Sequence, residues 1–183
     1  MMMKRLSGCL AVLAIFLSLA ANLSAAETLS ITSRSAILMD MKTGRILYSH
    51  NADAEIQPAS ITKVLTLYLA DEAILEGKVR LQDRVKISRK AGRTGGSRMF
   101  LEPGSELPLG ELLKGVAVVS ANDAAVAVAE YIAGGMERFV ESMNRKAREL
   151  GMSHSFFCNP NGLPAKGQVT TARDMVILAR AYL

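Results

Sequence analysis

Two short groups of polar residues, sixty positions apart, carry side chains that could cooperate in acyl transfer. The first group is the segment 58–63, which reads PASITK and places Ser60 three positions before Lys63. A serine hydroxyl attacks a carbonyl carbon efficiently only when a base takes its proton. Residues three apart share one face of a helix, so the amine of Lys63 can approach the hydroxyl of Ser60. The spacing predicts a nucleophile, Ser60, with Lys63 as its base.

The charge of Lys63 opposes this role. An ordinary lysine has a pKa of about 10.4, so half-neutrality at pH 7 requires a fall of roughly 3.4, or ~4.6 kcal/mol. Burial and a neighbouring cation can lower a lysine pKa in this way. A helix beginning at Ser60 would also aim free N–H groups at a developing oxyanion. Taken alone, the pattern is weak evidence and favours a helix cap followed by a surface lysine.

The second group, Ser120-Ala121-Asn122, interrupts an apolar stretch between residues 116–119 and an alanine-rich segment. Ser120 could relay a proton between Lys63 and a leaving group, and the Asn122 amide could hydrogen-bond the backbone of a substrate. The alternative is that Ser120 only caps the helix that follows it.

The elements that must position these residues can be read from the hydrophobic periods. Two β-prone runs flank a glycine-containing turn and predict a hairpin, and four longer segments have helical spacing. Thr171 and Asp174 have the spacing of a capping box that opens the last helix. The basic segment 80–98 contains three glycines and reads as a solvated, loop-rich face. The predicted strands are 35–39 and 45–49, and the predicted helices are 59–75, two within 107–134, 136–150 and one after 171.

Other chemistries find little support in the composition. His50 and His154 are the only histidines, and they lie far apart in the sequence without carboxylates at metal-ligand spacing. This argues against a zinc site and against a Ser-His-Asp triad. Cys158 reads as a buried structural thiol without a disulfide partner in the mature chain. The basic segment 80–98 lacks interleaved aromatic residues, so nucleic-acid binding is not expected. No metal or organic cofactor is called for.

Residues 1–26 have the features of a secretory signal. Lys4 and Arg5 precede an apolar run from residue 9 to 21, and small residues lead to a predicted cut after Ala26. An uncleaved anchor is the alternative, and Cys9 lies on the wrong side of the apolar run for lipid attachment. Removal of two cations and no anions changes the net charge from +5 to +3. The mature chain, 27–183, is expected outside the cytoplasm, in the periplasm or at the outer face of the cytoplasmic membrane.

Four segments together resemble the low-molecular-mass penicillin-binding proteins, which are serine-type D-Ala-D-Ala carboxypeptidases of cell-wall maturation. The resemblance implies an α+β fold of the serine β-lactamase and transpeptidase type, with an antiparallel sheet and a helical subdomain. It implies that Ser60 forms an acyl-enzyme, that Lys63 accepts the proton, and that Ser120 and Asn122 complete the second motif. The implied substrate is the D-Ala-D-Ala end of a peptidoglycan stem peptide, with β-lactam antibiotics as acylating mimics. The segments are 58–63, 120–125, 157–163 and 171–175.

The third motif of this family, K-T-G, lies on an edge strand after the other two. Lys42-Thr43-Gly44 matches it in letters but precedes Ser60 and falls in the predicted hairpin turn, so Lys42 receives no catalytic role. The true third motif, the remaining strands and any membrane-associating region are expected beyond Leu183. Residues 27–183 therefore form an incomplete catalytic domain that is expected to be inactive alone, since a lost oxyanion donor costs about 100- to 1,000-fold in rate.

Three other functions fit parts of the pattern. A serine β-lactamase shares the first two motifs, but class A enzymes have Asp where this chain has Ala121, and no Glu-x-x-Leu-Asn segment follows. A peptidoglycan D,D-endopeptidase on the same fold differs in the shape of its cleft. A non-catalytic relic that binds the cell wall is the third.

Overall fold

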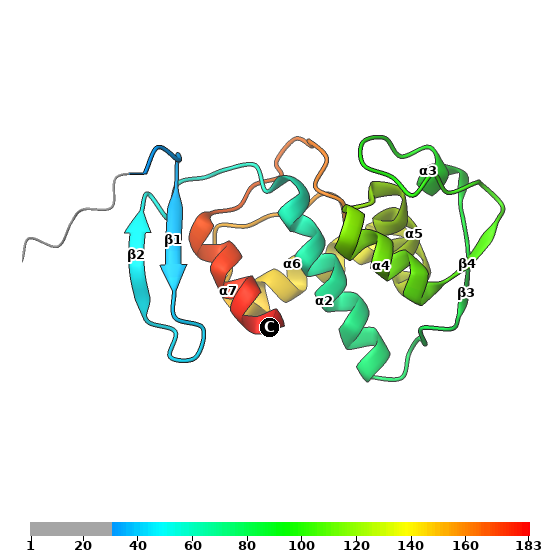
Figure 1. Ribbon diagram of the computed structural model, residues 1–183, viewed down its shortest axis with the longest axis horizontal. Coiled ribbons are helices and arrows are strands. Elements are labelled where there is room, and N and C mark those ends of the chain that lie inside the picture. The colour runs from blue at the N-terminus through cyan, green and yellow to red at the C-terminus, as the bar shows by residue number, and fades with distance from the viewer. Residues whose placement is uncertain (1–30) are drawn as a thin grey trace, which may run out of the picture. The chain divides into compact units, whose positions relative to one another are not determined.

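A computed structural model describes residues 31–183, which are short antiparallel strands and helices (Figure 1). The predicted signal segment, 1–26, lies outside the described residues. Within residues 31–183, no helix is both long and apolar enough to cross a membrane. The elements, in chain order, are β1 (Ala36–Met39), β2 (Ile46–His50), the 3-10 turn η1 (Ala59–Ile61), α2 (Thr62–Leu75), β3 (Arg84–Lys86), α3 (Arg89–Gly92), β4 (Glu106–Pro108), α4 (Leu109–Val119), α5 (Asn122–Ala133), α6 (Met136–Leu150) and α7 (Ala172–Tyr182).

The predicted hairpin is present, and its turn explains the misplaced K-T-G letters. β1 and β2 pair antiparallel, with an irregularity in register between Leu38 and Met39. In the turn, the N–H of Thr43 donates to Asp40 Oδ1 at 2.7 Å, and the N–H of Gly44 donates to the Asp40 carbonyl at 2.8 Å. Gly44 has φ +75°, which favours glycine. Lys42, Thr43 and Gly44 therefore belong to a structural turn in the hairpin.

Helix α2 runs between α4 and α5 on one side and α6 and α7 on the other (Figure 1), and it carries apolar residues on nearly every side. One core cluster joins it to α4 and α5, through residues such as Leu112, Val116 and Val128. A second cluster joins it to α6 and α7, where Phe139 and Met143 meet buried leucines of α2 and α7. Full burial of one such side chain contributes about 1.5–3 kcal/mol. Helix α2 is thus packed from two sides.

The predicted helices are confirmed, while the segment 80–98 differs from its prediction. It contains β3, which pairs with β4, and the single-turn helix α3, capped by Ser88 Oγ at 2.9 Å from the Ala91 N–H. Only Val85 of β3 is buried, so a strand of three residues leaves little periodic signal. Six cations of this segment are nonetheless exposed, as expected: Arg84, Lys86, Arg89, Lys90, Arg93 and Arg98.

Two local predictions need correction. The Thr171 hydroxyl does cap α7, accepting from the Asp174 N–H at 3.1 Å, but the Asp174 carboxylate does not return the bond. It accepts instead from the His154 N–H at 2.9 Å and the Ser155 hydroxyl at 2.7 Å, which tie α7 to the preceding turn. Cys158 is half-buried rather than buried.

Candidate active site

Ser60 and Lys63 are adjacent at the start of α2. Lys63 Nζ lies 3.2 Å from Ser60 Oγ. Ser60 is exposed, whereas the Lys63 side chain is buried, with 3% of its surface exposed. This burial lowers the Lys63 pKa from its ordinary 10.5 to about 8. A reachable hydroxyl beside a buried amine of lowered pKa is the arrangement that serine activation requires.

The local backbone differs from the simple helix start expected at Ser60. Ser60 lies inside the 3-10 turn η1, and α2 begins two residues later at Thr62. The residue before it, Ala59, has φ +45°, a left-handed conformation that costs an alanine about 1–2 kcal/mol. Such strain persists only where surrounding contacts impose it, and it is concentrated at functional sites. The nucleophile is therefore presented by a constrained turn.

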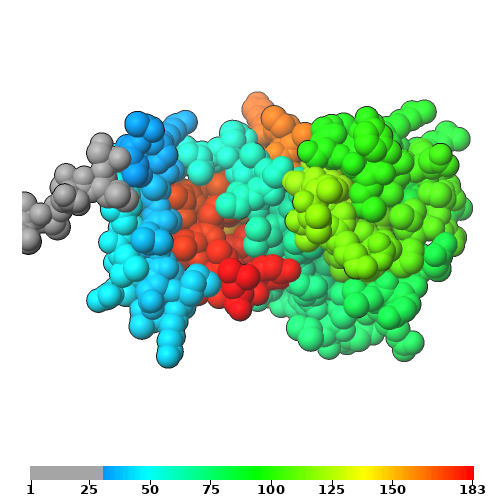
Figure 2. Space-filling model, viewed as in Figure 1, coloured from blue at the N-terminus to red at the C-terminus, as the bar shows by residue number. Residues whose placement is uncertain are grey.

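A loop far away in the sequence supplies that constraint. The backbone carbonyl of Asn161 accepts a hydrogen bond from Lys63 Nζ at 2.7 Å. Gly162, with φ +80°, lies so close to the Ala59 carbonyl that a Cβ at this position would overlap it. Figure 2 shows this loop, in orange, beside the cyan start of α2. Asn161 and Gly162 were part of the family resemblance but received no role, although an Asn-Pro-Asn-Gly sequence signals an ordered turn.

Ser120 sits between α4 and α5 and does not cap the second of them. It ends α4 in a left-handed conformation with φ +55°, and the N-terminal cap position of α5 is Ala121, without a side-chain hydrogen bond. The alternative interpretation of Ser120 as a helix cap is therefore wrong. Among the described residues, no hydrogen bond is made by the Ser120 hydroxyl. A strained residue with a free hydroxyl is consistent with a chemical role.

Asn122 is hydrogen-bonded to a neighbouring loop. Its side chain is buried, and Nδ2 donates to the Gly95 carbonyl at 2.8 Å, while its N–H donates to the Ser97 carbonyl at 2.7 Å. The buried Oδ1 has no partner within the described chain. Asn122 thus anchors the loop 95–97 with one end of its amide and leaves the other end free to receive a donor.

Contacts at two glycines link Asn122 to the loop beside Ser60. A Cβ on Gly96 would touch both Asn122 Nδ2 and Leu163 Cδ2, and the neighbouring Gly162 lies against the Ser60 backbone. The loop 95–97 held by Asn122 and the loop that borders the Ser60 turn are therefore neighbours. The catalytic roles of Ser60, Lys63, Ser120 and Asn122 stay predictions.

Asp123 was missed in the sequence because its role is to hold backbone. Its carboxylate is fully buried and accepts the N–H groups of Met99, Leu101 and Ala124 at 3.0, 3.1 and 2.9 Å. A carboxylate in the first turn of α5 also interacts favourably with the helix dipole. Asp123 thereby fastens the segment 99–101 next to Asn122.

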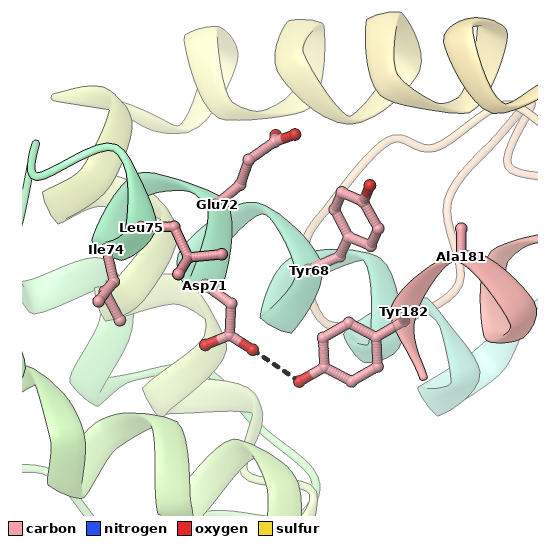
Figure 3. Close-up of a pocket in the computed structure, with 7 residues that line it drawn as sticks. All are labelled: Tyr68, Asp71, Glu72, Ile74, Leu75, Ala181 and Tyr182. Carbon is pink, nitrogen blue, oxygen red and sulfur yellow. Dashed lines mark hydrogen bonds between the residues drawn. The ribbon is translucent and has the colours of Figure 1, made fainter.

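A separate cavity of about 510 Å³ opens between α2 and α7, away from these residues (Figure 3). The Tyr182 hydroxyl donates to Asp71 Oδ2 at 2.9 Å across it. Burial, followed by the Asp71 bond, raises the Tyr182 pKa to about 12. A neutral phenol and an already paired carboxylate offer no nucleophile, so the candidate active site is the α2 start.

Comparison with known proteins identifies the family. The family model described as D-alanyl-D-alanine carboxypeptidase, peptidase S11, matches residues 22–183. The chain belongs to this family. It is 46% identical over 151 residues to D-alanyl-D-alanine carboxypeptidase DacF of Bacillus subtilis, covering 82% of this chain and 39% of that protein. It is 33% identical over 156 residues to a D-alanyl-D-alanine endopeptidase of Pseudomonas aeruginosa, covering 83% and 49%.

Solved structures agree with the sequence relatives. The D-alanyl-D-alanine carboxypeptidase DacD of Francisella tularensis superposes with a TM-score of 0.82 at 40% identity, covering 84% of this chain and 37% of that one. Penicillin-binding protein D2 of Listeria monocytogenes, solved with bound ampicillin, superposes at 0.75 with 25% identity, covering 84% and 62%. The predicted family and α+β fold are confirmed. The chain spans about two fifths of the first of these relatives.

Proposed function

We propose that this chain carries the acylating centre of a serine-type D-Ala-D-Ala carboxypeptidase. The observation that supports the proposal is the pair of Ser60 and Lys63, with a separation of 3.2 Å between hydroxyl and amine. Family membership supplies the substrate class, a peptidoglycan stem peptide that ends in D-Ala-D-Ala. β-Lactams are proposed as mimics that acylate the same hydroxyl.

The proposed reaction begins with transfer of the Ser60 proton to Lys63 and ends with hydrolysis of an acyl-enzyme. With a pKa of about 8, roughly a tenth of the Lys63 amines are neutral at pH 7 and can accept the Ser60 proton. Ser60 Oγ then attacks the carbonyl carbon of the penultimate D-Ala. The peptide C–N bond breaks as the departing D-Ala amine takes a proton, delivered through the free hydroxyl of Ser120. Water hydrolyses the resulting ester and regenerates Ser60.

The setting of the protein is part of the proposal. Residues 1–26 are proposed to be a cleaved export signal, and 27–183 part of the catalytic domain, acting in the periplasm or cell envelope. The mature charge of +3 suits an anionic cell wall. Peripheral association with the inner membrane is part of the same proposal.

A fluorescent penicillin tests the proposal directly. The protein at its full encoded length is incubated with the probe, and Ser60→Ala serves as the control. The expected result is a labelled band that disappears in the variant and is prevented by unlabelled ampicillin. A band that persists in Ser60→Ala, or no band from the folded wild-type protein, overturns the proposal. Residues 27–183 alone are expected to give no band.

A D,D-endopeptidase is the second candidate, favoured by the relative of that name in Pseudomonas aeruginosa. Both reactions use the same acyl-enzyme and differ in the group that leaves. Release of D-Ala from a monomeric pentapeptide supports the carboxypeptidase. Cleavage of cross-linked dimers without that release supports the endopeptidase.

A further inference from the structure

The segment 157–162 is fastened to the helical core by buried polar side chains that the reaction does not use. This segment carries the Asn161 carbonyl that binds Lys63 and the Gly162 that lies against the Ser60 turn. It has no regular secondary structure, and the residue before it, Phe156, forms an isolated bridge with Val169. Its position therefore depends on the side chains that hold it.

Thr66 holds the middle of the segment. It lies one turn after Lys63 on α2 and is fully buried. A threonine in a helix commonly returns its hydroxyl hydrogen bond to a carbonyl of its own helix. Thr66 Oγ1 instead donates to the Pro160 carbonyl at 2.7 Å, directly before the Asn161 carbonyl that accepts from Lys63 Nζ at 2.7 Å. Two successive carbonyls are thus bound by donors one helical turn apart.

Asn144 holds the beginning of the segment. From α6, its Oδ1 accepts the Phe157 N–H at 2.9 Å, and its Nδ2 donates to the Phe157 carbonyl at 2.8 Å. Nδ2 also donates to the Val140 carbonyl at 3.0 Å, one turn earlier on α6. A single buried amide therefore pairs with Phe157 as a neighbouring strand would. Both amide ends are matched, which fixes the orientation of the side chain.

We propose that Thr66 and Asn144 are positioning residues for Lys63, which act by holding the Asn161 carbonyl and the Ser60 turn in place. The inference rests on the proposed function only for the role of Lys63 as a base. The hydrogen bonds themselves are independent of any activity. Loss of the hydrogen bonds from Thr66 or from Asn144 should let residues 159–162 of this segment move away from α2.

The expected consequence is a change in the environment of Lys63. Burial is what lowers the pKa of its amine, and the segment 159–162 provides part of that burial. Within residues 31–183, Lys63 takes part in no salt bridge, and its hydrogen bonds are to Ser60 and the Asn161 carbonyl. Movement of the segment admits water to the amine, so its pKa should rise toward 10.5.

The chain offers a matched pair of threonines for the test. Thr62 and Thr66 are both fully buried on α2, one turn apart, but within residues 31–183 the Thr62 hydroxyl has no hydrogen-bond partner. Thr66→Val and Thr62→Val therefore delete the same atom from comparable surroundings, and only the first deletion breaks a bond to the segment 157–162. Thr66→Ser keeps the hydroxyl and is the rescue variant.

The measurement is the pKa of the Lys63 amine, by NMR of isotope-labelled lysine, with the signal assigned by its loss in Lys63→Met. Penicillin labelling is followed on the same variants, made in the protein at its full encoded length. We expect Thr66→Val to raise this pKa and to slow labelling at pH 7 by about tenfold for each unit of the rise, as the neutral fraction falls. Thr62→Val and Thr66→Ser should resemble the wild type.

Equal pKa values in Thr66→Val and Thr62→Val, whether both unchanged or both raised, overturn the positioning role. If Thr66→Val does not fold while Thr62→Val does, Asn144→Asp takes its place, because the carboxylate keeps the acceptor but repels the Phe157 carbonyl. If the Thr66→Val pKa rises and even the wild type takes no label, the positioning role stands and the proposed function fails.

Discussion

Gly162 lies against the carbonyl group of Ala59, and the Ser60 N–H is 3.1 Å from where a Cβ at position 162 would stand. The two backbones belong to segments about a hundred residues apart. Their contact explains why Ala59 can keep a left-handed conformation, because the loop occupies the space into which the turn would otherwise relax. Geometry at the nucleophile therefore depends on a glycine outside either polar motif.

Gly162→Ala should accordingly damage both stability and acylation. The added methyl group overlaps the Ala59 backbone, which cannot rotate away, and φ +80° is itself unfavourable for alanine. Together these effects should lower the free energy of unfolding by about 2–4 kcal/mol. Gly77→Ala is the control, since Gly77 has φ +71° but open space around its Cα, and it should lose only about 1 kcal/mol. Chemical unfolding and penicillin labelling measure the two effects. Equal losses in both variants would contradict the role of the contact.

The sequence predicted the helices whose apolar residues recur with a clear helical period. It missed the short strands that exist only because they pair with each other. Helix 136–150 was predicted to the residue because Phe139, Met143 and Ala147 recur on one face before Gly151. β3 and β4 were missed because three residues carry too little pattern, and their pairing depends on chain 22 residues away.

The site divides in the same way. Ser60 and Lys63 are close in sequence, so helical spacing alone predicted their proximity. Asn161, Thr66 and Asn144 act across 13 to 98 positions through backbone carbonyls, which every residue has, so residue type carries no signal for them. Asp123 is similar, since it binds three N–H groups.

Buried Lys63 should make stability depend on pH in a defined direction. Its folded pKa of about 8 is below its ordinary 10.5, so between these values the unfolded chain holds a proton that the folded chain has lost. The free energy of unfolding therefore rises with pH over this window, by about 3 kcal/mol, and the full cost is present below pH 8. Lys63→Met lacks this cost.

Unfolding of wild type and Lys63→Met at several pH values checks this prediction. The variant should be the more stable at pH 7, and the difference should shrink as pH approaches 10.5. Taking the difference removes contributions from other titrating groups. The variant should also fail to react with penicillin, which separates stability from function. If the free energy of unfolding changes with pH in the same way in both proteins, the charged Lys63 amine does not destabilise the folded state.

Ser120 should show an opposition between stability and activity. Its φ of +55° strains any residue with a Cβ, so Ser120→Gly should increase the free energy of unfolding by about 0.5–1 kcal/mol. Ser120→Ala keeps the strain and should change stability little. Both lack the hydroxyl and should slow acylation by roughly 100-fold or more. If Ser120→Gly and Ser120→Ala have equal free energies of unfolding, the backbone at Ser120 is not strained.

Asp123 should control the order of the loop that borders Asn122. Asp123→Asn preserves shape but turns one acceptor into a donor facing backbone N–H groups, at a cost of about 3 kcal/mol. Glu111→Gln is the control, because Glu111 pairs with Lys114 at the surface, and it should change stability by less than about 1 kcal/mol. Hydrogen exchange at the amides of Met99 and Leu101 reads the loop directly and should accelerate only in Asp123→Asn. If those two amides stay protected while global stability falls, Asp123 supports the helix core and the loop is held by other contacts.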